Sequence, residues 1–341
     1  MKKQTPPDLS PSEKILKKLS GHFESDKKTL IDGIHSLRAN NAPSVECKIL
    51  GIALYKLLLD NGLNESDVIN TSRLLEKVDG FLYNNQTDTA LAILEVLDAI
   101  QLFKKTDEDG YRVYCFNNEI EAKIFEADGV ITKTITWLPS LRPTLLAQKA
   151  KIYLENNQPR HAESTINELL EINPVSFTGH ILQANLYKEK NPKKFRQLVM
   201  RAWEYAYTPD HFVQFFVNLY TFYVAKEDLV TAYAVLNAVN IYENSEELND
   251  ELAAVRQKMG RTVVTPFKVP TAEQVLMILQ REGIDVQISP RNYGILIDIY
   301  QQHFLAQDDK EFMKEVATYI QGFAGQEDII KIIQKKLKNG R

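Results

Sequence analysis

Apolar residues recur at helical spacing through residues 143–174, and polar residues mark where the helices end. Ala150 and Tyr153 lie three positions apart and therefore share one face of a predicted helix. Pro159 begins a second helix after a short polar turn, and Pro174 ends it. The apolar positions of the second helix are Ala162, Ile166 and Leu169. The pattern predicts a helical hairpin.

The same pattern occurs earlier in the chain. Residues 81–90 (FLYNNQTDTA) are echoed by residues 153–162 (YLENNQPRHA), 72 positions later (153 − 81), which is about two hairpin units. Weaker copies extend over residues 71–102, 177–209 and 210–245. Repeats with this period predict a stacked array in which each hairpin buries its apolar face against its neighbours.

The hairpin of residues 143–174 resembles the tetratricopeptide repeat. That repeat has a small residue, then an aromatic residue, an alanine and a proline at fixed intervals, and Ala150, Tyr153, Ala162 and Pro174 match all of them. The resemblance implies an all-α fold, an α-solenoid of stacked helical hairpins.

A looser resemblance extends over residues 110–305. Residues 116–119 (FNNE) and 204–210 (EYAYTPD) are similar to segments of uncharacterised tetratricopeptide-repeat proteins of Firmicutes bacteria. This resemblance implies no particular activity.

Residues 103–140 depart from the helical pattern. Within them, residues 130–137 (VITKTITW) are rich in β-branched side chains, which favour a strand. The same run could form a short buried helix that ends before Pro139, and the helical neighbours favour this second interpretation. Residues 103–140 are therefore an insert in the all-α array, for which a small β or irregular element stays open beside the short helix.

The chain divides into six predicted parts. They are a disordered tail at 1–12, an N-terminal helical region with a degenerate repeat at 13–102, the insert at 103–140, the repeat array at 141–259, a linker at 260–270 and a C-terminal helical region at 271–341. The linker contains two prolines and no helical period. Beyond residue 325 the chain is amphipathic and basic, which is typical of a solvated tail or of an electrostatic docking arm.

Composition narrows the class of partner. A net charge of −4 over 341 residues argues against a dedicated nucleic-acid binder, which would have a strongly basic face. The sequence contains no secretory signal at residues 1–12 and no apolar run of the roughly 18 residues that a membrane span needs. Cys47 and Cys115 lie far apart without metal-ligand spacing, so we expect reduced thiols and a cytoplasmic protein.

Signatures of catalysis and cofactor binding are missing from the sequence. It has no Walker-type phosphate loop, no G-x-G-x-x-G, no H-E-x-x-H and no G-x-S-x-G. Its 6 histidines include no pair at the four-residue spacing of helical metal ligands. The acidic residues are spread along the predicted helices and suggest no carboxylate pair for acid–base chemistry. We expect a protein that is not an enzyme and that needs no cofactor or metal.

The tetratricopeptide resemblance implies a ligand groove lined by the first helix of each hairpin. Lys151, Asn185 and Thr221 fall at the same position in successive units and would form a polar ladder able to bond the backbone of an extended peptide. Ala147 stands where members that clamp a terminal carboxylate have lysine, so that specialisation is not expected. The implied groove residues are Thr144, Ala147, Lys151, Thr178, Ile181, Asn185, Gln214, Val217 and Thr221. The alternative is an exposed polar stripe that binds nothing.

Aromatic residues crowd the stretch 203–223, and the predicted helix from Pro209 to Ala225 is apolar almost all round. Such a helix is either packed between neighbours or presents an aromatic surface to a partner, where aromatic side chains dominate binding energy. The inner helices of an array pack on two sides, which favours the first interpretation.

The sequence therefore predicts a protein-interaction or scaffold module that binds a peptide or protein segment in the groove. The alternative is a peptide-sensing regulatory protein in which residues 12–66 form a helical effector region. That region lacks the tight turn of a helix-turn-helix motif. An enzyme of unrecognised chemistry would have room only in residues 103–140. The partner remains an unidentified protein or peptide, and the oligomeric state is open.

Overall fold

The computed structural model describes residues 9–40, 42–61, 71–84, 86–100, 112–129, 135–139, 142–243, 245–262, 269–323 and 325. Over these residues the protein is helical apart from one two-stranded sheet, which confirms the all-α class with a small β element. None of the described helices is long and apolar enough to cross a membrane.

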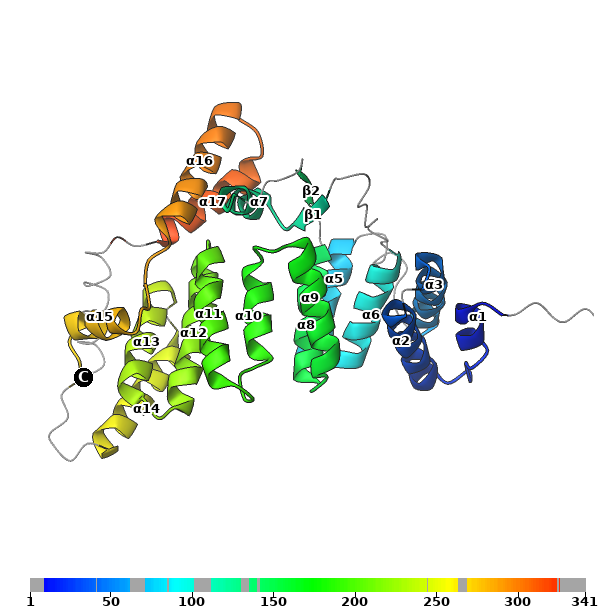
Figure 1. The fold of residues 1–341 in the computed structure, drawn as a ribbon, viewed down its shortest axis with the longest axis horizontal. Coiled ribbons are helices and arrows are strands. Elements are labelled where there is room, and N and C mark those ends of the chain that lie inside the picture. The colour runs from blue at the N-terminus through cyan, green and yellow to red at the C-terminus, as the bar shows by residue number, and fades with distance from the viewer. Residues whose placement is uncertain are drawn as a thin grey trace, which may run out of the picture.

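The elements follow the chain in this order: α1 (Pro11–Leu16), α2 (Phe23–Ala39), α3 (Ser44–Asp60), α5 (Thr71–Tyr83), α6 (Thr87–Ile100), β1 (Arg112–Phe116), α7 (Glu119–Ala127), β2 (Ile135–Pro139), α8 (Arg142–Glu155), α9 (Pro159–Ile172), α10 (Phe177–Asn185), α11 (Pro192–Ala202), the 3₁₀ turn η1 (Trp203–Tyr205), α12 (Pro209–Ala225), α13 (Leu229–Tyr242), α14 (Glu246–Thr262), α15 (Ala272–Arg281), α16 (Pro290–Ala306) and α17 (Lys310–Gly322). Helices α2 to α13, apart from α7, stand side by side in one row (Figure 1). Neighbours in the row that are also consecutive in the chain pack in pairs: α2 on α3, α5 on α6, α8 on α9, α10 on α11 and α12 on α13.

The same turn closes three of these pairs. In each, the backbone N–H that follows the turn donates to the carbonyl of the aromatic residue near the end of the first helix. The N···O distances are 2.8 Å for Gln86 to Phe81, 2.8 Å for Gln158 to Tyr153 and 3.0 Å for Asp228 to Tyr223. Asn157 and Glu227 precede two of the donors in the left-handed conformation, with φ of 54° and 60°. This is the Schellman end of a helix, and its recurrence shows that the sequence repeat is also a structural one.

Small residues lie where paired helices touch. Ala150 and Ala162 of the α8–α9 pair have no exposed surface, and neither has Ala90, Ala184 or Ala232 in the other pairs. An alanine lets two helix axes approach closely because its side chain occupies little of the gap between them. Helix α12 packs in the core through larger side chains, because Phe212, Phe215 and Phe216 are fully buried. The predicted core role of this aromatic helix is confirmed.

The insert is a β–α–β unit. Strands β1 and β2 pair in parallel, with Arg112 opposite Ile135 and Phe116 opposite Pro139, and α7 connects them. The helical interpretation of residues 130–137 is therefore wrong for the part that the structure describes, because Ile135 to Trp137 lie in β2. A strand forms here because β1 supplies backbone partners from elsewhere in the chain. Residues 103–111 and 130–134 lie outside the described residues.

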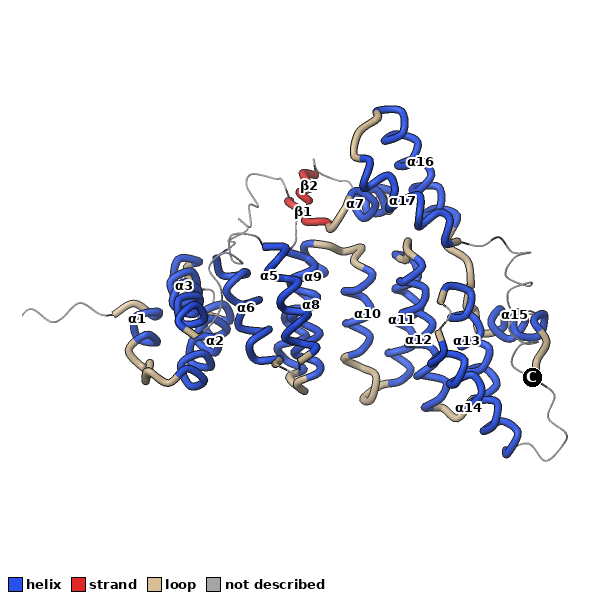
Figure 2. Tube along the Cα trace, turned by 180° about the vertical axis from the view of Figure 1, so that it is seen from behind, coloured by secondary structure: helices blue, strands red, loops and turns tan. Residues whose placement is uncertain are grey.

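The C-terminal helices fold back over the insert. In Figures 1 and 2, α16 and α17 lie beside α7 above the row of helices. His303 of α16 bonds Glu119 of α7 through Nε2 at 2.9 Å, and Arg291 forms an ion pair with Asp128. Helix α14 continues to Thr262, within the predicted linker, of which residues 263–268 lie outside the described residues.

Candidate functional site

The first helices of three successive pairs, α8, α10 and α12, border a groove of about 710 Å³, here called the α8–α10–α12 groove. Its lining residues are Lys151, Leu154, Glu155, Asn157, Pro159, Thr178, Ile181, Leu182, Asn185, Leu186, Lys188, Glu189, Lys190, Gln214 and Asn218. Leu154, Ile181 and Leu182 supply apolar surface that the core buries on one side. Amide and charged side chains surround that surface, so the groove combines apolar contacts with hydrogen-bonding groups.

Part of the predicted groove set meets in this depression. Lys151 of α8, Thr178, Ile181 and Asn185 of α10, and Gln214 of α12 all line it. They come from three helices that are far apart in the chain and are aligned by the repeat. Lys151 and Asn185, two members of the predicted ladder, therefore face the same space.

The other predicted residues do not line the groove. The hydroxyl of Thr144 donates to the Asn117 side-chain oxygen at 2.9 Å, and that of Thr221 donates to the Asn218 carbonyl at 2.8 Å. Ala147 is half-buried, and Val217 is 42% exposed. The ladder is therefore interrupted at its third position, because the Thr221 hydroxyl is bonded to its own helix.

Several lining residues escaped the sequence prediction. Asn157 lies in the α8–α9 turn, and Lys188 and Lys190 follow α10. They lie outside the helix positions that the family resemblance assigns to the groove. Lysines in a polar turn look like ordinary solvated surface in the sequence, and only the packing of α8, α10 and α12 places these lysines beside the groove. Their spacing carries no signal that could have found them.

The cations of the groove are free to meet a ligand. No ion pair joins Lys151, Lys188 or Lys190 to another residue in the described ranges, and each side chain is at least partly exposed. Glu155 and Glu189 share the rim, so the charge is mixed. A mixed rim with an apolar floor suits a peptide, whose backbone needs donors and acceptors and whose side chains need apolar contact.

A buried polar cluster lies between α2, α6 and α8. The carboxylate of Glu95, which has no exposed surface, contacts Lys149 Nζ at 2.8 Å and Arg38 at 2.9 Å. Asp98, one helical turn further along α6, contacts Lys149 and Arg38 at 2.9 Å each. Glu95 and Asp98 are thus neighbouring buried carboxylates held by two cations, a pair that the sequence pattern did not reveal. The prediction missed this pair because its partners come from two distant helices.

The Glu95 carboxylate also accepts a hydrogen bond from the Tyr153 hydroxyl at 2.9 Å and contacts His35 Nε2 at 2.9 Å. Burial on its own raises the pKa of Glu95, but Lys149 and Arg38 outweigh burial and hold that pKa well below its usual value. The pKa of Asp98 is lowered for the same reasons. Both carboxylates stay charged and fully partnered, so they join the helices and carry no proton to donate at neutral pH.

The histidines in the core are held neutral. Burial lowers the pKa of His180 to about 4 and that of His211 to about 3. His180 bonds the Pro174 carbonyl at 2.8 Å and stacks on Tyr205. Among the residues that the structure describes, no three histidine, cysteine or acidic side chains are grouped to hold a metal ion.

Comparisons with protein-family models, with curated proteins and with solved structures found no match for this chain. The α8–α10–α12 groove therefore has to be interpreted from its own geometry.

Proposed function

We propose that the protein is an α-solenoid of tetratricopeptide type that binds an extended peptide or protein segment in the α8–α10–α12 groove. The observation that supports this most is the convergence of Lys151, Asn185 and Gln214 from three successive repeats on one depression. A second support is the recurrent Schellman turn, which makes the hairpins equivalent units.

The proposed mechanism is recognition by a preformed surface. The groove helices are fixed by the core beneath them, so a ligand meets little ordering cost on the side of the protein. Asn185 and Gln214 can each donate and accept a hydrogen bond, which matches the alternating donors and acceptors of a peptide backbone. Ile181 and Leu182 would take apolar side chains of the bound segment.

The N-terminal helices belong to the array in this proposal. The Glu95–Lys149–Arg38 contacts tie α2 to α6 and α8, so α2 is packed into the row like the helices after it. The alternative, a regulator with an independent effector at residues 12–66, gains no support from these contacts.

Peptide selection tests the groove. A random-peptide phage library is selected on the wild-type chain, and the selected peptides are synthesised with a fluorophore. We expect Lys151→Glu/Asn185→Glu to weaken their binding at least tenfold, because it reverses the charge at Lys151, introduces a charge at Asn185 and removes two polar contacts. The matched control, Lys28→Glu/Gln197→Glu, makes the same charge change at exposed positions outside the groove.

Equal binding to the wild type and to the groove variant would show that the peptides bind elsewhere and would contradict the assignment. Failure to select any peptide from a folded chain would contradict peptide binding itself. Circular dichroism and thermal unfolding of both variants separate lost binding from lost folding.

A further inference from the structure

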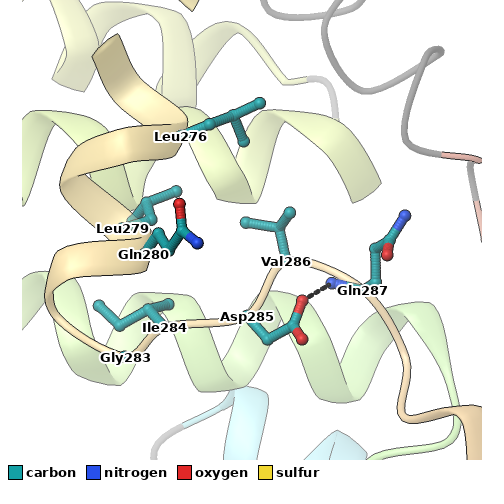
Figure 3. A pocket seen from close by; sticks show the side chains of 8 residues that line it. All are labelled: Leu276, Leu279, Gln280, Gly283, Ile284, Asp285, Val286 and Gln287. Atoms are coloured by element: carbon teal, nitrogen blue, oxygen red, sulfur yellow. Dashed lines mark hydrogen bonds between the residues drawn. The ribbon is translucent and has the colours of Figure 1, made fainter. Parts of the chain in front are cut away.

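Two depressions of the structure differ in charge. The one beside α15 has a volume of about 460 Å³, and Asp285 is the charged side chain of its lining. In Figure 3 the Asp285 carboxylate accepts a hydrogen bond from the Gln287 backbone N–H, at 2.9 Å. The α8–α10–α12 groove is lined instead by three lysines and two glutamates. Of the two depressions, the groove is therefore the one that offers cations to a ligand.

The positive charge of the groove continues into the turn that follows α10. Residues 188–194 (KEKNPKK), here called the α10–α11 turn, carry four lysines and one glutamate, and all seven residues are exposed. Their net charge is +3 (4 − 1), in a chain whose net charge is −4. Lys188 and Lys190 line the groove itself. Among the described residues, no acidic side chain forms an ion pair with any of the four lysines.

The α10–α11 turn is held in place by its own hydrogen bonds. The Asn191 backbone N–H donates to the Tyr187 carbonyl at 2.9 Å, and the Asn191 side-chain oxygen accepts from the Lys194 backbone N–H at 3.1 Å. The Lys194 ammonium lies 3.6 Å from the centroid of the Tyr187 ring, which packs against the core. The lysines thus stand on an ordered backbone, so a ligand gains their charge without first ordering the turn.

The charged and apolar parts of the groove follow one another along α10. Ile181 and Leu182 lie within α10, and Lys188 and Lys190 come after its end. The turns after α8 and α10 lie at one edge of the row, on the side away from the insert (Figure 1). Because Glu155 lines the groove near the end of α8, the cations are concentrated on the α10 side of that edge.

We propose that the segment bound in the α8–α10–α12 groove is acidic, and that Lys188 and Lys190 contact its side-chain carboxylates. Its apolar residues contact Ile181 and Leu182, and its acidic residues lie beside the α10–α11 turn, where each lysine can form a charge-assisted hydrogen bond. The inference rests on the proposed function of the groove and adds the chemistry of the partner. The groove lining includes no aromatic side chain on which bases could stack, which favours a peptide over a nucleic acid.

Three phage libraries test the charge of the bound segment. Each joins a randomised stretch to a fixed block of three aspartates, three asparagines or three lysines, placed at one end or the other. The carboxyl end is fused to the coat protein, so that no terminal carboxylate is displayed. On the wild-type chain we expect peptides with aspartates to be enriched at least tenfold over those with asparagines, and added salt to reduce this preference.

A variant of the turn and a matched control locate the effect. In Lys188→Glu/Lys190→Glu we expect the preference to pass to the lysine library, because two cations beside the groove become anions. The control Lys48→Glu/Lys56→Glu makes the same charge change at exposed positions of α3 and should keep the preference for aspartate. Circular dichroism checks that both variants are folded.

Equal enrichment of the aspartate and asparagine libraries on the wild type would overturn the acidic ligand. The proposed function is judged separately, because peptides that Lys151→Glu/Asn185→Glu weakens still bind in the groove. Aspartate peptides that bind Lys188→Glu/Lys190→Glu as tightly as the wild type would overturn the contact with the turn. If no library is enriched, peptide binding and this inference both fail. Binding of a labelled oligouridine in that case, lost in the turn variant, would assign the lysines to a nucleic acid.

Discussion

At the scale of single residues, Lys149 is the central cation of the buried polar cluster between α2, α6 and α8. Lys149 is 3% exposed, and it is the cation that both Glu95 and Asp98 share with Arg38. Methionine has a side chain of similar length but carries no charge. The substitution therefore leaves the buried carboxylates of Glu95 and Asp98 with too few partners. We expect Lys149→Met to lower the free energy of unfolding by about 3–5 kcal/mol, measured by urea denaturation.

The control is Lys149→Met combined with Glu95→Gln, which removes one anion with the cation and should cost less than Lys149→Met alone. If Lys149→Met lowers the free energy of unfolding by less than about 1 kcal/mol, the buried polar cluster contributes little to stability.

The stabilisation by this cluster should also depend on pH. The folded-state pKa values of Glu95 and Asp98 are lowered, so their stabilisation is present above the unfolded pKa of about 4 and is lost as the pH falls below it.

At the scale of elements, the repeated turn makes a prediction of its own. Asn157 and Glu227 occupy equivalent left-handed positions, which asparagine tolerates better than glutamate does. We expect Glu227→Gly to raise the free energy of unfolding by about 0.5–1 kcal/mol, because glycine carries no Cβ strain there. Asn157→Gly is the matched control and should raise it less. A loss of stability in Glu227→Gly, measured by thermal unfolding, would contradict this account of the turn.

The turn also shows what local sequence can predict. The Asn-Asn-Gln motif, the aromatic residue before it and the alanine after it obey short-range rules, so the hairpins and their contacts were predictable. The pairing of β1 with β2 was not, because a strand needs a partner that lies elsewhere in the chain. Lys149 and Glu95 look like surface residues in sequence, and only the crossing of α6 and α8 buries them. Within the groove, the helix positions were predicted and the lysines of the following turn were missed.

At the scale of the whole molecule, the protein is a row of hairpins whose C-terminal helices return to the middle of the chain. Buried apolar residues of α16 and α17, among them Leu296 and Val316, belong to the main core, and polar contacts add to this packing. Asn292 donates to the carbonyls of Glu204 and Ala206 at 3.0 and 2.9 Å, and Arg291 reaches the Glu204 carbonyl at 2.6 Å. The α16–α17 hairpin thus joins the insert to the η1 turn.

The contact between α16 and α7 should depend on pH. His303 lies between Glu119 of α7 and Asp308 after α16, at 2.9 and 2.7 Å, with the edge of Phe312 against its ring. The hydrogen bond to Glu119 and that to Asp308 raise the pKa of His303. Its protonated form therefore favours the docked hairpin below the unfolded pKa of about 6.5, and that contribution is lost as the pH rises through the folded value.

We expect amide exchange in α16 and α17 to quicken from pH 6 to pH 8.5 more than the intrinsic chemistry requires, and this excess to disappear in His303→Gln. The energy involved is on the order of 0.5 kcal/mol, since the pair is partly exposed to solvent. His180 and His211 have lowered pKa values and act in the opposite direction, so the difference between wild type and variant isolates His303. An identical pH profile in His303→Gln would assign the closure of the hairpin to Arg291 and Asn292 instead.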